Sequence, residues 1–121
     1  MASLQDLQQS GQSTWLNYLR NSFIRSGELA ERIRSGIQGV TANAQVYERA
    51  IIGSADYDEG IRRATAAGKP ARLVFESLMV EDIQRAADIL RPVFEAGGRR
   101  DGLVSYEIDP VLLGDVTTAV A

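Results

Sequence analysis

Three short apolar runs along this chain each stop at a polar residue, and helical patterns fill the stretches between them. The polar residues are Asn17, Asn43 and Glu107. Strands that alternate with helices are typical of a parallel sheet joined by right-handed crossovers. In β/α-barrels, the side chains that carry chemistry lie at the carboxyl ends of such strands. The pattern therefore predicts an α/β sheet with candidate site residues along one edge.

The expected elements follow from hydrophobic periodicity and from capping residues. We expect strands at 14–18, 39–41 and 103–108 and helices at 3–10, 21–34, 43–52, 56–67 and about 73–94, with a further helix beginning at 111. Ser3 and Ser26 are candidate helix N-caps. Pro92 falls within the longest helix, which it is expected to kink or tighten, and Asp109 is expected to form a turn before Pro110.

The length of the chain limits how much of a barrel it can form. A closed eight-stranded barrel needs about 250 residues, whereas this sequence has 121. We therefore expect one domain over residues 1–121, a partial, TIM-barrel-like fold with about three parallel strands. Such a sheet has two free edges and one open face, on which we expect Trp15, Leu16 and Val104. We expect this face or an edge to mediate self-association or docking on another protein, unless the longest helix folds over the face.

Composition excludes several classes of function. The sequence has no cysteine and no histidine, so thiol catalysis, disulfides and the commonest metal ligands are absent. Its net charge is −3 and its arginines are interspersed with acids, which argues against a nucleic-acid partner. No stretch is long and apolar enough to span a membrane, and we expect a cytoplasmic protein without cofactor or metal. The acidic run 56–59 fits the first turn of a helix better than a metal site.

Several segments in the same order and spacing resemble the amino-terminal part of transaldolase. The main ones are GQSTWLN at 11–17, GVTANA at 39–44, DYD at 56–58, RPVF at 91–94 and DGLVSYEIDP at 101–110. The resemblance runs from about residue 5 to residue 115, and several motifs in register make it specific. It implies a (β/α)8 barrel that moves a three-carbon dihydroxyacetone unit between sugar phosphates through a lysine Schiff base.

The resemblance also implies roles for the three strand-end residues. Asn17 stands where the family usually has an aspartate that acts as acid and base. Asn43 corresponds to an asparagine that holds substrate hydroxyl groups, although its neighbours Ala42 and Ala44 depart from the usual Ser-Asn-Pro. Glu107 corresponds to a glutamate that helps a water molecule relay protons. The only lysine, Lys69, lies in an expected Gly-Lys-Pro turn, so we expect no transaldolase chemistry from this chain alone.

Each strand-end residue also has a purely structural interpretation. Asn43 is favoured as the N-cap of the next helix, and Glu107 could keep a structural hydrogen bond instead of acting as a base. Our leading hypothesis is a truncated, catalytically inactive transaldolase-like chain that acts as an interaction, assembly or accessory protein. One piece of a split or decayed gene that functions only with a complementing half is a separate possibility. The alternatives are an enzyme of another reaction class that uses Glu107 in a pocket completed by oligomerisation, and a non-catalytic module that binds a small polyol or sugar phosphate.

Overall fold

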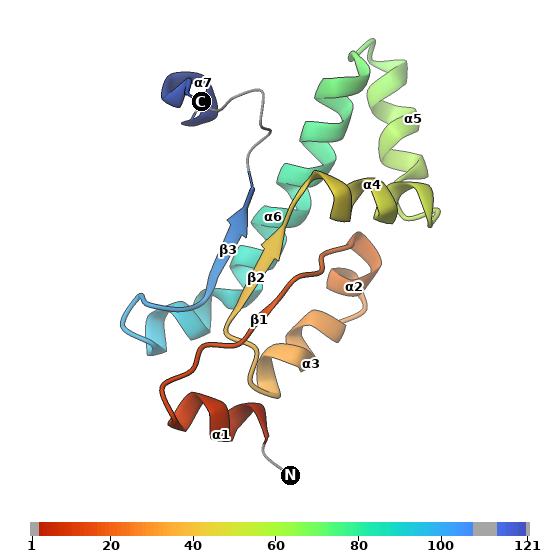
Figure 1. Cartoon of the computed structure of the whole chain (residues 1–121). Coiled ribbons are helices and arrows are strands. Elements are labelled where there is room, and N and C mark those ends of the chain that lie inside the picture. Colours follow the sequence, from red (N-terminus) through yellow and green to blue (C-terminus); the bar gives the residue numbers. More distant parts are fainter. Residues whose placement is uncertain (1–2, 108–113, 121) are drawn as a thin grey trace.

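The computed structural model describes residues 3–107 and 114–120 and shows a parallel sheet with helices along one face (Figure 1). The elements, in chain order, are α1 (Leu4–Gln9), β1 (Trp15–Leu16), α2 (Asn21–Arg25), α3 (Glu28–Arg34), β2 (Gly39–Ala42), α4 (Ala44–Ile52), α5 (Asp58–Ala66), α6 (Ala71–Ala96), β3 (Leu103–Tyr106) and α7 (Val116–Val120). The expected Asp109–Pro110 turn and the helix start at Val111 lie outside the described residues.

The three strands pair in the order β1-β2-β3, and both pairs are parallel. Trp15 is opposite Gly39, and Gly39 is in turn opposite Leu103. Strands that succeed one another along the chain and pair in parallel require a crossover between them, which the helices provide. The predicted α/β, partial-barrel architecture is confirmed.

The hydrophobic core lies between the sheet and the helices. Its fully buried members come from every layer and include Leu29 on α3, Val40 on β2 and Leu90 on α6. Leu16 and Val104 pack against this cluster, so the prediction that they belong to the open face is wrong. Because successive side chains of a strand point to opposite faces, Trp15 lies on the open face. The expectation that α6 could cover that face is also wrong, since Leu90 packs on the other side.

Trp15 covers part of the open face by lying across the neighbouring strand. A Cβ atom added at Gly39 would lie 2.4 Å from two carbons of the indole ring. The indole Nε1 donates a 2.9 Å hydrogen bond to the Ser13 hydroxyl. Gly39 therefore provides the space for the aromatic ring. The ring in turn covers Gly39, which is buried although it lies on the open face.

Several expected helices are confirmed and one is corrected. Ser3 caps α1, with Asp6 completing a reciprocal capping box, and α6 continues through Pro92 as one helix. The single helix expected over 21–34 is two, because the chain turns at Gly27 with φ at +86°. A positive φ is unfavourable for residues with a Cβ atom, which explains a glycine between α2 and α3.

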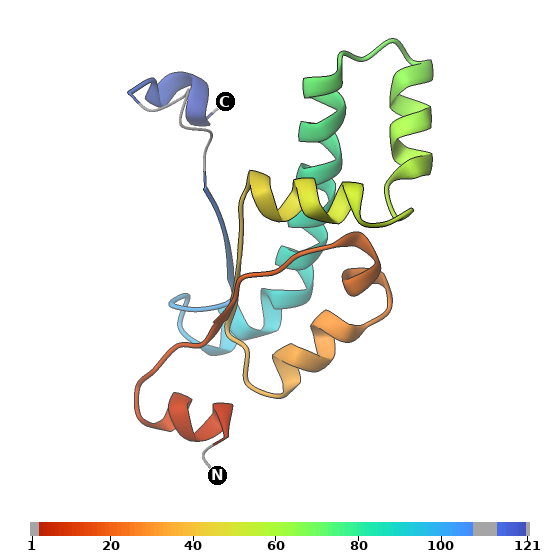
Figure 2. The same cartoon turned by 45° about the vertical axis from the view of Figure 1, so that its right-hand side comes forward.

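Helices α4 and α5 and the first half of α6 extend beyond the carboxyl ends of the strands, where α5 and α6 form a hairpin (Figure 2). The turn between α5 and α6 contains Gly68, with φ at +74°, and Lys69. Among the described residues, no helix has both the length and the hydrophobicity that a membrane crossing requires.

Candidate functional site

The three predicted site residues lie at one edge of the sheet and on one face. Each follows the carboxyl end of its strand: Asn17 after β1, Asn43 after β2 and Glu107 after β3. Counting back by two from each residue gives Trp15, Thr41 and Ser105, all on the face without helices. The alternation of side chains therefore brings the three residues to the same rim, as expected for strands of a β/α fold.

Below Asn43 and Glu107, nearer the middle of the strands, lies a second level of polar side chains, the polar layer, formed by Asn17, Thr41 and Ser105. Sequence reasoning missed Thr41 and Ser105. The Thr41 hydroxyl donates a 3.0 Å hydrogen bond to Oδ1 of Asn17. Thr41 is also the register partner of Ser105. Asn17 just after β1, Thr41 on β2 and Ser105 on β3 thus lie at one level of the open face. The signal that could have found Thr41 and Ser105 is their period-two spacing from Asn43 and Glu107.

Asn43 begins the helix that follows β2. Its Oδ1 accepts a 2.9 Å hydrogen bond from the backbone N–H of Val46, which makes it the N-cap of α4. This confirms the favoured structural interpretation. The bond uses one of the two acceptor sites of the side-chain oxygen, and the Nδ2 group is a donor that could bind a ligand.

The backbone of Glu107 fixes its place at the rim. Its N–H donates a 3.1 Å hydrogen bond to the carbonyl oxygen of Ala42, which continues the pairing of β3 with β2. Glu107 and Asn17 are both exposed to solvent. The described residues therefore do not enclose either side chain.

Lys69 is remote from the rim. It is exposed in the turn between α5 and α6, at the tip of the hairpin (Figure 1). It lines an apolar cavity of about 350 Å³ between the helices, together with residues such as Ile61, Val74 and Phe75. The structure therefore does not bring the lysine together with Asn17, Asn43 or Glu107.

A buried polar cluster behind the sheet was also missed by sequence reasoning. Asp82 on α6 is 1% exposed and accepts 2.8 Å hydrogen bonds from the Tyr57 hydroxyl and from Nδ2 of Asn21. Burial raises the pKa of Asp82, and the two hydrogen bonds oppose that shift in part. The cluster joins the segment after β1 to the helical hairpin, so its geometry is that of a structural connection.

The acidic run 56–59 divides between two structural roles. Asp58 and Glu59 lie in the first turn of α5, as predicted. Asp56 pairs instead with Arg20 Nε at 2.7 Å and accepts a 3.0 Å hydrogen bond from the Ser22 N–H. Hydrogen bonding from Ser22 and Arg20 lowers the pKa of Asp56. Within residues 3–107 and 114–120, no cluster of acidic residues has the geometry of a metal site.

The arrangement of polar strand ends agrees with a comparison of the sequence with protein families. A model described as transaldolase/fructose-6-phosphate aldolase matches residues 14–121. The chain belongs to this family. The matched residues include all three strands of the described sheet and the polar residues at their ends.

Individual relatives give the same result. The chain is 42% identical over 119 residues to "Transaldolase 2" of Nostoc punctiforme. This alignment covers 98% of this chain and 31% of that protein. It is 40% identical to a "Transaldolase" of Saccharopolyspora erythraea (99% and 32% covered) and 32% identical to one of Neisseria meningitidis (99% and 34%). This transaldolase-family chain thus spans about a third of the length of the curated relatives it matches.

Proposed function

We propose that these 121 residues do not perform transaldolase chemistry by themselves and that they act as an interaction or assembly element of a transaldolase-family protein. The observation that carries the proposal is the position of Lys69 at the tip of the α5–α6 hairpin, away from the rim. A Schiff base forms only where an amine can reach the substrate carbonyl. The rim supplies amides and a carboxylate but no lysine.

Asn17 is a second chemical deficit at the rim. An amide does not exchange protons near neutral pH, so it cannot act as a general acid or base. Its Oδ1 accepts a hydrogen bond from the Thr41 hydroxyl, an interaction that an ionised aspartate could also form. The residue thus retains the hydrogen-bonding geometry without the proton transfer.

The assembly part of the proposal rests on the sheet. β1 and β3 are the edge strands of the described sheet, and Leu103 on β3 is 43% exposed. Edge strands offer backbone groups to another chain and are usually covered or paired. We therefore expect self-association or binding to another protein through an edge or the open face, in the cytoplasm.

Chemical trapping tests the catalytic part. The purified chain is incubated with fructose 6-phosphate and borohydride, and its intact mass is measured. We expect no adduct and no transfer of a dihydroxyacetone unit to an acceptor aldose phosphate. An adduct that disappears in Lys69→Ala would refute the proposal. Arg72→Ala, which removes a neighbouring exposed cation, serves as the matched control.

Sedimentation velocity tests the assembly part. We expect a species heavier than the 13.2 kDa monomer, alone or after addition of the missing part of a relative. The Leu103→Asp variant should weaken this association, whereas Leu73→Asp, at a position of similar exposure on α6 (49%), should not. The proposal is contradicted if the chain stays monomeric at micromolar concentration, both alone and after that addition.

The polar layer favours a second candidate, a rim that binds a small polyol or sugar phosphate. Asn17 just after β1, Thr41 on β2 and Ser105 on β3 lie at one level and offer the hydroxyl and amide groups that recognise sugar hydroxyls. A ligand-dependent rise in melting temperature that Ser105→Ala abolishes would support it. Turnover that is lost in Glu107→Gln, with the fold intact, would instead support an enzyme of another reaction class.

A further inference from the structure

The cavity that Lys69 lines lies between α4, α5 and the first half of α6, beyond the carboxyl ends of the strands (Figure 2). We call it the hairpin cavity. Its volume is about 350 Å³, and its described lining includes none of the rim residues. Its walls are the apolar side chains of Ile51 on α4, Ile61 on α5 and Val74, Phe75 and Leu78 on α6. Val74 is buried and the other four are half-buried, so a ligand that covered them would gain hydrophobic contact area.

Packing within the hairpin holds the walls of the cavity in place. The Phe75 ring packs edge-on against the buried Tyr47 ring, with ring centres 6.4 Å apart and planes at 82°. Gly60 on α5 allows a close approach to α6, because a Cβ atom added there would lie 2.6 Å from Cδ2 of Leu78. Preformed, mostly apolar cavities with a few polar groups are the usual binding sites of small molecules. The hairpin cavity has both properties.

The polar residues of the hairpin cavity lie at one end, where α5 ends and α6 begins. Thr65 is in the last turn of α5, and Lys69 is in the turn between the two helices. Ala71, the first residue of α6, also lines the cavity, and Pro70 before it makes no side-chain hydrogen bond to the first turn of α6. The N-terminus of a helix carries partial positive charge, which adds to the charge of Lys69. This end of the cavity therefore favours an anion.

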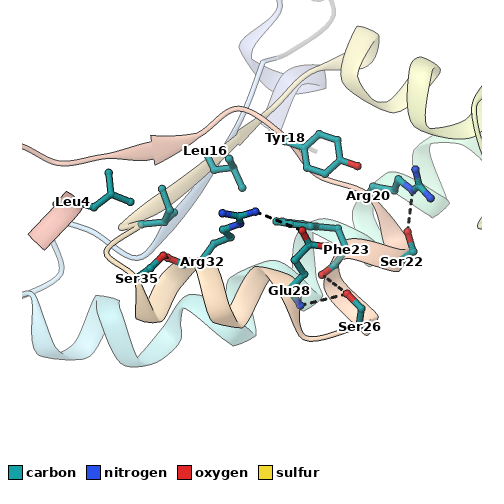
Figure 3. Close-up of a pocket in the computed structure, with 11 residues that line it drawn as sticks. Leu4, Leu16, Tyr18, Arg20, Ser22, Phe23, Ser26, Glu28, Arg32 and Ser35 are labelled. Carbon is teal, nitrogen blue, oxygen red and sulfur yellow. Dashed lines mark hydrogen bonds and ion pairs between the residues drawn. The ribbon is translucent and has the colours of Figure 1, made fainter. Parts of the chain in front are cut away.

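Lys69 is a cation without an acidic partner among the residues that the structure describes. No ion pair of these residues includes it, whereas the exposed Arg72, three residues later, pairs with Glu76 at 2.9 Å. A larger hollow beside β1, of about 650 Å³, differs in this respect, because its Arg32 pairs with Glu28 at 3.7 Å (Figure 3). The hairpin cavity thus combines apolar walls with an unmatched positive charge.

We infer that the hairpin cavity binds a small amphipathic carboxylate, with its apolar body against Ile61, Val74 and Phe75 and its carboxylate beside the ammonium group of Lys69. An apolar cavity of about 150 Å³ holds benzene, so the hairpin cavity, at about 350 Å³, has room for a body of about eight carbons. The charge of Lys69 selects the anion over a neutral compound of the same shape. The inference goes beyond the proposed assembly function, because it involves neither the rim nor an edge of the sheet.

Isothermal titration calorimetry of the chain tests the inference with three probes: sodium octanoate, octan-1-ol and sodium acetate. We expect octanoate to bind about two- to fivefold more tightly than octan-1-ol, which is the effect of one exposed ion pair, and acetate not to bind detectably. Lys69→Met keeps an apolar side chain but removes the charge, so it should abolish the preference for octanoate. Arg72→Met removes a nearby cation that does not line the cavity. It is the matched control and should keep the preference.

A second pair of variants tests the position of the ligand. Ala71→Phe places a ring in the cavity and should weaken the binding of octanoate and octan-1-ol together. Ala67→Phe adds the same ring at an exposed position close by that does not line the cavity, and it should leave both affinities unchanged. Circular dichroism of each variant separates a filled cavity from a lost fold. If Ala71→Phe does not fold, the comparison of Lys69→Met with Arg72→Met still decides.

Several results would overturn the inference. They are the absence of octanoate binding at millimolar concentration, equal affinities for octanoate and octan-1-ol, and binding that neither Lys69→Met nor Ala71→Phe alters. Self-association that Ala71→Phe abolishes and octanoate does not displace would make a second copy of the chain the occupant and would also overturn it. Each of these results leaves the assembly function to its own test at Leu103.

Discussion

The hydroxyl group of Tyr57 donates a 2.8 Å hydrogen bond to the carboxylate of Asp82, and both side chains are almost fully buried. The second carboxylate oxygen accepts from Nδ2 of Asn21, whose backbone N–H in turn donates to the Tyr57 oxygen at 2.9 Å. The three residues come from the start of α2, the start of α5 and the middle of α6. This cluster therefore connects the helical hairpin to the segment that follows β1.

Removing the Tyr57 hydroxyl should destabilise the protein. Tyr57→Phe leaves a buried carboxylate with one donor fewer and the Asn21 N–H without its acceptor, which costs about 1–3 kcal/mol of the free energy of unfolding. Urea denaturation at neutral pH measures the loss. Tyr47→Phe is the matched control, because Tyr47 is equally buried but donates only a 3.4 Å bond to the Met79 carbonyl. Equal losses in the two variants would contradict the assigned role.

The raised pKa of Asp82 predicts a pH dependence of stability. Burial favours the protonated form in the folded state, so the folded protein binds more protons than the unfolded chain above the ordinary value of 3.8. The contribution of Asp82 to the free energy of unfolding is therefore greatest at low pH and falls as the pH rises through the folded pKa. Asp82→Asn removes this fall.

Urea denaturation from about pH 4 to neutral pH measures this effect. The compared quantity is the free energy of unfolding of Asp82→Asn minus that of the original protein, and we expect this difference to increase as the pH rises. Arg85 and Glu81 on α6 act on Asp82 with opposite signs and are unchanged in the variant. Asp88→Asn, which alters an exposed acid of the same helix that pairs with Arg91, serves as the matched control. A constant difference between Asp82→Asn and the original protein would contradict the prediction.

The sheet and its rim were predictable because their signals are local. Asn17, Asn43 and Glu107 each end a short apolar run, and helical patterns separate the runs, so the parallel pairing of the strands and the edge that carries these residues were predictable. The cap at Asn43 was predictable for the same reason. Thr41 and Ser105 required one more step, the assignment of a face to each strand.

What the sequence did not predict depends on contacts between distant segments. β1 is only two residues long, with bulky side chains on both faces, so its pattern could not show that Leu16 faces the helices and Trp15 the open side. Asp82 follows Glu81 in sequence and resembles a solvated residue. Only the approach of Tyr57 and Asn21 makes it a buried acid.

The Asn43 cap can be separated from a role in ligand binding. Asn43→Ala removes the acceptor for the Val46 N–H and should lower the free energy of unfolding by about 1 kcal/mol. Asn43→Ser restores a capping oxygen and should recover most of that loss, as measured by chemical denaturation. If both variants are as stable as the original protein, the side chain is not needed for α4, and its retention at the rim would point to a ligand.

Gly39 and Trp15 should show energetic coupling. Gly39→Ala places a Cβ atom where the indole ring now lies, 2.4 Å from its carbons. The ring must move, which is expected to cost about 1–3 kcal/mol. In a Trp15→Leu background the obstruction is absent, so the same substitution should cost clearly less. Chemical denaturation followed by circular dichroism measures both steps of this cycle, since the only tryptophan is removed in one of them. Strictly additive losses would show that the ring does not need the space that Gly39 provides.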